Sequence, residues 1–77
     1  MFDTKNVRYI TDYTAACKVV GAHLGYTGKS GGWIYDAAGK RICQGWSTLA
    51  SRKNWTKLGI IRFDVDIRKH IVDLNRA

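Results

Sequence analysis

The clearest structural signal in this chain lies in residues 31–46, which read GGWIYDAAGKRICQGW. Two short β-prone runs, 33–35 and 41–44, are separated by the five residues DAAGK. An Asp at the start of a type I turn, followed by a Gly in the left-handed region, is typical of a β-hairpin with a G1 bulge. The sequence therefore predicts a hairpin over residues 33–44.

The two faces of this hairpin differ in chemistry. The expected register pairs Tyr35 with Arg41, Ile34 with Ile42, and Trp33 with Cys43. Because side chains alternate along a strand, one face holds Trp33, Tyr35, Arg41 and Cys43, and the other holds Ile34, Ile42, Gln44 and Trp46. If the two isoleucines face the core, the rings and Arg41 are exposed. The opposite packing would bury them, and the sequence alone leaves both open.

Helical periodicity precedes the hairpin. Apolar residues recur at helical spacing from Tyr13 to Leu24, after a Thr-Asp start in which Thr11 can cap and Asp12 suits the first turn. We therefore expect a helix over residues 12–24. Gly21 weakens this helix but lets another element approach closely.

The C-terminal part predicts a strand and a second helix. Residues 60–63, IIRF, are strand-like, and Ile67, Ile71 and Leu74 then follow at helical spacing after an Asp that can cap. We expect a helix over residues 65–75.

Residues 61–71, IRFDVDIRKHI, resemble the end of excisionase-type winged-helix DNA-binding domains, where a strand ending in Arg-Phe precedes a helix that begins at Asp. The resemblance implies DNA binding. The middle of the chain does not follow the helix–turn–helix pattern of that family. In its general character, short, basic and rich in aromatic residues, the chain is similar to many small bacteriophage-encoded regulators.

These elements predict one small α+β domain over residues 1–77. It would contain an antiparallel sheet of about three strands, made of hairpin 33–44 and strand 60–63, packed with helices 12–24 and 65–75. Residues 26–32, YTGKSGG, predict a flexible loop. Residues 47–58, STLASRKNWTKL, fit either a short helix capped by Ser47 or a long basic loop.

Positive charge is concentrated in the middle of the chain. The sequence has 13 Lys and Arg residues and 6 acidic residues, a formal net charge of +7. The charges cancel within residues 1–12 and within 64–77, so segment 13–63, whose one acid is Asp36, carries the whole excess. A surface of one sign attracts polyanions over about one Debye length.

Aromatic residues interleave with cations in the same segment. Rings stack on unpaired bases and cations neutralise phosphates, so this pattern is typical of nucleic-acid binding. The candidate binding residues are Lys29, Trp33, Tyr35, Lys40, Arg41, Arg52, Lys53, Trp55 and Lys57. We expect a small nucleic-acid-binding regulator. The alternative is a small inhibitor whose basic surface meets an acidic site on a host protein, such as transcription, restriction or CRISPR machinery.

The sequence contains no complete motif for catalysis, for cofactor binding or for metal binding. Gly28, Lys29 and Ser30 match the end of a phosphate-binding P-loop, but His23 stands where that motif needs its first Gly, and the chain is too short for the rest of an NTPase. The two Cys and two His lack the close pairs of a zinc site. We therefore predict a protein that is not an enzyme and needs no metal or cofactor.

The chain shows no basic-then-apolar leader and no apolar run of about 18 residues, so we expect a cytoplasmic protein that does not enter a membrane. In that compartment Cys17 and Cys43, both expected on inward faces, are more typical of reduced thiols than of a disulfide, although a disulfide is possible.

Overall fold

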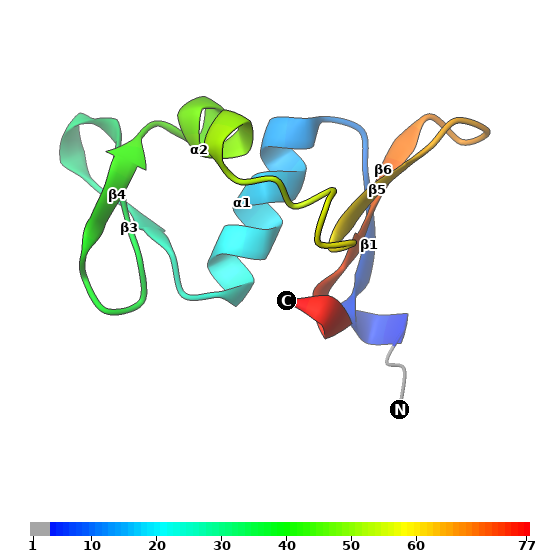
Figure 1. Ribbon diagram of the computed structural model, residues 1–77, viewed down its shortest axis with the longest axis horizontal. Helices are drawn as coiled ribbons and strands as arrows, with labels where there is room; N and C mark the ends of the chain where they lie inside the picture. The colour runs from blue at the N-terminus through cyan, green and yellow to red at the C-terminus, as the bar shows by residue number, and fades with distance from the viewer. Residues whose placement is uncertain (1–3) are drawn as a thin grey trace.

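Helix α1 (Tyr13–His23) lies between two small antiparallel sheets in the computed structural model, which describes residues 4–77 (Figure 1). One sheet has the strand order β1-β6-β5, formed by β1 (Val7–Ile10), β6 (Lys69–Asp73) and β5 (Ile61–Asp64). The other has the order β2-β3-β4, formed by β2 (Thr27–Gly28), β3 (Trp33–Tyr35) and β4 (Arg41–Gln44). Helix α2 (Trp46–Arg52) follows β4, and short 3-10 turns cover Thr4–Asn6, Ser30–Gly32 and Leu74–Arg76. The predicted α+β class is confirmed.

The ends of α1 are set by local hydrogen bonds. Asp12 is the N-cap, because its Oδ2 accepts from the Ala15 amide at 2.9 Å. The expectation that Thr11 caps the helix and that Asp12 lies in its first turn is therefore wrong, because Thr11 precedes the cap. At the C-terminus the Gly25 amide donates to Ala22 O at 3.1 Å and the next amide donates to Gly21 O at 2.7 Å, which is a Schellman motif. The predicted helix over 12–24 is confirmed, with its two terminal residues acting as caps.

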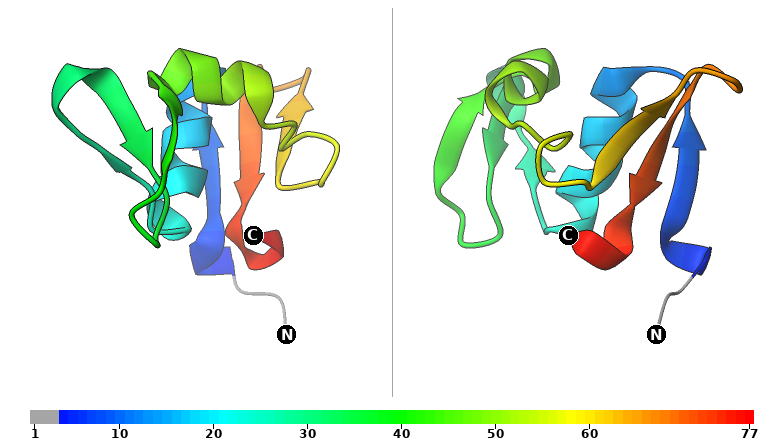
Figure 2. Two further views of the ribbon diagram at one scale, coloured as in Figure 1. Left: turned by 60° about the vertical axis from the view of Figure 1, so that its left-hand side comes forward. Right: turned by 45° about the vertical axis from the view of Figure 1, so that its right-hand side comes forward.

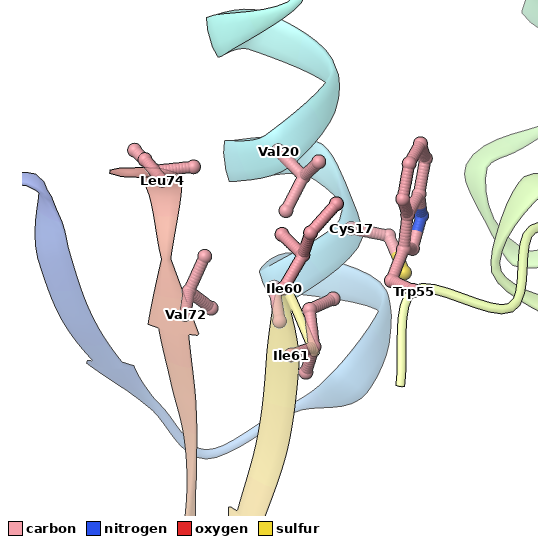
Figure 3. Close-up of a cluster of buried hydrophobic side chains, with 8 residues drawn as sticks. Cys17, Val20, Trp55, Ile60, Ile61, Val72 and Leu74 are labelled. Atoms are coloured by element: carbon pink, nitrogen blue, oxygen red, sulfur yellow. The ribbon is translucent and has the colours of Figure 1, made fainter. Parts of the chain in front are cut away.

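The main core lies between α1 and the β1-β6-β5 sheet (Figure 3). Val20 points from α1 toward Ile60, and Cys17 points toward Trp55. Cys17 and Val20 are fully buried, as are Ile61 and Val72 of the sheet. The whole buried cluster consists of Ala16, Cys17, Val20, Trp55, Ile60, Ile61, Val72 and Leu74. Cys17 and Cys43 are free and buried, as expected for reduced thiols.

The predicted helix over 65–75 is wrong. Residues 65–68 form a turn, and the chain returns as β6, the central strand of its sheet. The Asp64 carboxylate accepts from the amides of Asp66 at 2.9 Å and Ile67 at 3.3 Å, so it closes a hairpin turn instead of capping a helix. Ile67 is 48% exposed and takes no part in the core. The terminal helix implied by the resemblance to excisionase-type domains is thus absent from the described residues.

The expected single sheet is also wrong. Strand 60–63 exists, as β5, but it pairs with β6, whereas hairpin 33–44 pairs with β2. The structural reason is the new strand β6, which joins β5 to β1 and so completes a separate sheet on the other side of α1.

A second small core holds the β2-β3-β4 sheet and α2 against α1. Ile34, Cys43 and Leu49 are buried there, and Trp46 packs against them. A Cβ placed on Gly21 would lie 2.7 Å from Cζ3 of Trp46, so the absence of a side chain lets the indole rest on the backbone of α1. The close approach predicted at Gly21 is confirmed. Helix α2 begins after an N-cap at Gly45, not at Ser47.

Candidate nucleic-acid interface

The hairpin turn forms as the sequence predicts. The Gly39 amide donates to Asp36 O at 3.0 Å, the Asp36 amide donates to Lys40 O at 2.9 Å, and Gly39 has a φ of 83°, which together make the G1 bulge. The carboxylate of Asp36 accepts from the amides of Ala38 and Lys40 at 3.0 and 2.9 Å. Asp36, the one acid of segment 13–63, is therefore occupied by the turn.

The hairpin register is confirmed at its inner pair and shifts beyond it. Tyr35 faces Arg41 as expected, but an irregularity between Ile34 and Tyr35 sets Ile34 opposite Cys43 in place of Ile42. This shift brings Cys43 onto the buried face beside Ile34. Trp33, in turn, faces Gln44 and not Cys43.

Trp33 and Tyr35 consequently point away from the small core. Ile34, which lies between them on β3, is buried, and side chains alternate along a strand. Arg41 is exposed and shares the outer face with Tyr35, its register partner. Of the two packings that the sequence leaves open, the structure adopts the one that turns the rings outward, where both are half-buried. Within residues 4–77, no helix covers this outer face of the β2-β3-β4 sheet (Figure 1).

A cation lies over each of these rings. The Cζ atom of Arg41 is 4.2 Å from the centroid of the Trp33 ring, and Nζ of Lys29 is 5.3 Å from the centroid of the Tyr35 ring. Both distances are within the range of cation–π attraction, which is worth about 0.5–1 kcal/mol at exposed sites. The outer face therefore presents two aromatic rings with their cations already in place.

The segment that carries Lys29 is ordered by hydrogen bonds, so the flexible loop expected over 26–32 is wrong. The Lys29 amide donates to Trp33 O at 2.8 Å, and the Gln44 side chain donates to Gly31 O at 2.9 Å. Gly31 and Gly32 adopt φ values of 77° and 80°, which L side chains rarely adopt. These glycines let the chain turn tightly from β2 into β3 and hold Lys29 beside Tyr35.

The remaining candidate residues are spread over α2 and the segment after it. Arg52, the last residue of α2, donates from Nη1 to Ile42 O at 3.3 Å and so lies at the edge of β4. Lys53 and Lys57 belong to the segment that runs from α2 to β5, and Lys57 is exposed. Lys40 is exposed in the hairpin turn.

Trp55 is the one candidate that the structure removes from the surface. Its side chain is 5% exposed and packs in the main core beside Cys17 and Val20 (Figure 3). A stacking role is therefore incompatible with its position. Because the core of so small a domain needs large apolar side chains, one tryptophan of the basic segment is used to fill it.

Two polar residues on the outer face were not among the candidates. Thr27 is exposed and pairs with Tyr35, and Gln44 is exposed and pairs with Trp33. Thr27 was missed because YTGKSGG has no strand signal. Gln44 would have been found if the register shift at Ile34 could be seen in the sequence.

The described residues contain no group of three or more His, Cys, Asp or Glu side chains that could hold a metal ion. No helix within residues 4–77 has the length and apolar character needed to cross a membrane. Burial raises the pKa of the Cys17 thiol and of the Tyr13 hydroxyl, because it disfavours the charged form of each group.

Comparison with models of known protein families, with curated proteins and with solved structures finds no match to this chain.

Proposed function

We propose that the protein binds nucleic acid without catalysing a reaction, and that the outer face of the β2-β3-β4 sheet is the contact surface. The observation that carries this proposal is the pairing of Trp33 with Arg41 and of Tyr35 with Lys29 on an uncovered sheet face. The excess charge of segment 13–63 supports it, because this face belongs to the same segment.

The proposed contacts follow from the chemistry of the pairs. The Arg41 guanidinium lies over the indole of Trp33, and a guanidinium is planar, so an unpaired base can stack on a face that the indole leaves free. The N–H groups at its edge can donate to a phosphate at the same time. Lys29, Lys40 and Arg52 then neutralise phosphates along the bound strand.

A tryptophan-fluorescence titration tests the proposal. A generic single strand and a generic duplex are each added to the protein at three salt concentrations. Binding should weaken with a linear fall of log K against log salt, and Trp33 should be quenched by the single strand. The variant Arg41→Met should lower the magnitude of the salt slope by about one phosphate contact. The matched control is Lys18→Met, which removes the same charge from an exposed position of α1.

Unchanged binding in Arg41→Met would contradict the assigned surface. No binding of either nucleic acid at low salt would overturn the proposed function and favour an acidic protein partner. Trp33→Phe identifies the fluorescent reporter, because quenching by the single strand should disappear with this indole while the salt dependence of binding, followed by the anisotropy of a labelled strand, is retained.

A further inference from the structure

Among the described residues, 4–77, no element covers the face of the β1-β6-β5 sheet that points away from α1 (Figure 2). The strand register sets Tyr9, Ile71 and Arg62 side by side on one rung across the three strands. Val7 and Asp73 form the rung two residues further along, so their side chains share that face. Val72 and Ile61 lie on the opposite face, which is buried against α1.

These five side chains surround a hollow. Together with Gly59 and Arg76 they line a volume of about 340 Å³, which is in the range of sites that bind small molecules. Arg76 comes from the C-terminal 3-10 turn and rests against Gly59, where a Cβ would lie 2.9 Å from its Nη1. The guanidinium of Arg76, which packs on the backbone of Gly59, thus forms one end of the hollow.

The charges around the hollow favour an anion. Oδ2 of Asp73 lies 3.4 Å from Nε of Arg76, and its Oδ1 accepts from the amide and side chain of Asn75 at 3.1 and 3.0 Å. The one carboxylate is therefore occupied by its neighbours. Arg62 is exposed and forms no ion pair within residues 4–77, so one full positive charge of the lining is uncompensated.

We propose that this hollow binds a small organic anion. Arg62 and Arg76 would hold its carboxylate or phosphate group, because guanidinium N–H groups match the oxygens of either anion. Val7 and Ile71 form an apolar floor for the rest of the ligand, and Tyr9, exposed at the side, offers a ring for a planar body. The site is separate from the proposed nucleic-acid surface and does not depend on it.

The test is an amide NMR titration of the whole chain with four probes: phenyl phosphate, benzoate, inorganic phosphate and benzyl alcohol. Phenyl phosphate or benzoate should shift the resonances of β1 and β6 saturably, and the stronger of the two identifies the anionic group. Inorganic phosphate should bind more weakly, and benzyl alcohol should cause no saturable shift. Saturable binding of benzyl alcohol with the same affinity would overturn the role of the arginines.

Two variants and one control sharpen the result. Arg62→Met should weaken phenyl phosphate binding by about tenfold or more, because a charge-assisted hydrogen bond is lost. Tyr9→Ala should weaken phenyl phosphate and leave inorganic phosphate unchanged. Lys18→Met removes one charge from α1 and should change neither. Equal losses in Arg62→Met and Lys18→Met would show that net charge, not this site, attracts the probes, and would refute the proposal.

Discussion

Replacing Gly21 by Ala tests how the second sheet is attached to α1. Ala is favoured over Gly inside a helix by about 1 kcal/mol, so propensity alone predicts stabilisation. The new Cβ, however, would lie 2.7 Å from Cζ3 and 3.0 Å from Cη2 of Trp46, closer than carbon atoms approach. Overpacking of this kind costs about 1–3 kcal/mol. We therefore expect a net loss of about 1 kcal/mol in the free energy of unfolding, and a melting temperature lower by about 4–8 °C.

A double-mutant cycle with Trp46→Leu separates the two effects, with each variant followed by urea denaturation at low temperature. Leucine is too short to reach the position of the indole ring. In the Trp46→Leu background, Gly21→Ala should therefore become stabilising by up to about 1 kcal/mol, as propensity predicts. If Gly21→Ala stabilises the wild-type chain, or has the same effect in both backgrounds, the packing of Trp46 on the helix backbone does not have the role we assign to it.

Two further perturbations address the helix cap and the buried thiol. Asp12→Ala should lower the free energy of unfolding by about 1 kcal/mol, because the Ala15 amide loses its acceptor. Thr11→Ala should lower the free energy of unfolding by less. Equal urea midpoints for the two variants would contradict the assigned cap. Because burial raises the pKa of Cys17, the native state holds its proton more tightly than the unfolded chain, so stability from this group is lost as pH rises above 9.0. Iodoacetamide should leave Cys17 unmodified in the native protein and alkylate it in urea, and alkylation of Cys17 in the native protein would contradict its burial. In urea denaturation, the midpoint should fall less between pH 7 and pH 10 in Cys17→Ala than in the wild-type chain.

The sequence predicts elements that local chemistry determines. The hairpin over 33–44 follows from Asp36 and Gly39, whose turn forms by hydrogen bonds within five residues. Helix α1 likewise begins at an Asp and ends in a Schellman motif built from neighbouring residues. In both cases the hydrogen bonds that define the element join residues only a few positions apart, so no distant contact is needed to identify it.

The error over residues 65–75 has a specific physical cause. An Asp that accepts from the amides two and three residues ahead can begin either a helix or a hairpin turn, and Asp64 does the second. Ile71 and Leu74 then fit helical spacing by coincidence. Residues 69–73 form a strand because they pair with β1, a segment more than fifty residues earlier in the chain. The local sequence pattern gives no indication of this distant partner.

In the candidate site, Trp33 and Trp55 likewise differ in whether local residues or distant contacts determine their position. The outward direction of Trp33 follows from alternation about Ile34, once the hairpin is known to pack through that isoleucine. The burial of Trp55 depends on β5 and α1 meeting around it, which is a tertiary event (Figure 3). Spacing alone therefore could not distinguish a tryptophan that stacks from one that fills the core.

The size of the domain explains why two sheet faces remain open. A chain of 77 residues builds cores large enough to cover only the α1 side of each sheet, so the outer faces need side chains that tolerate water. Threonine or lysine would meet that need on β3. The structure instead places Trp33 and Tyr35 there, each beneath a cation, although neither ring belongs to a buried cluster. Because these half-buried rings fill no part of either core, their role is better sought in binding.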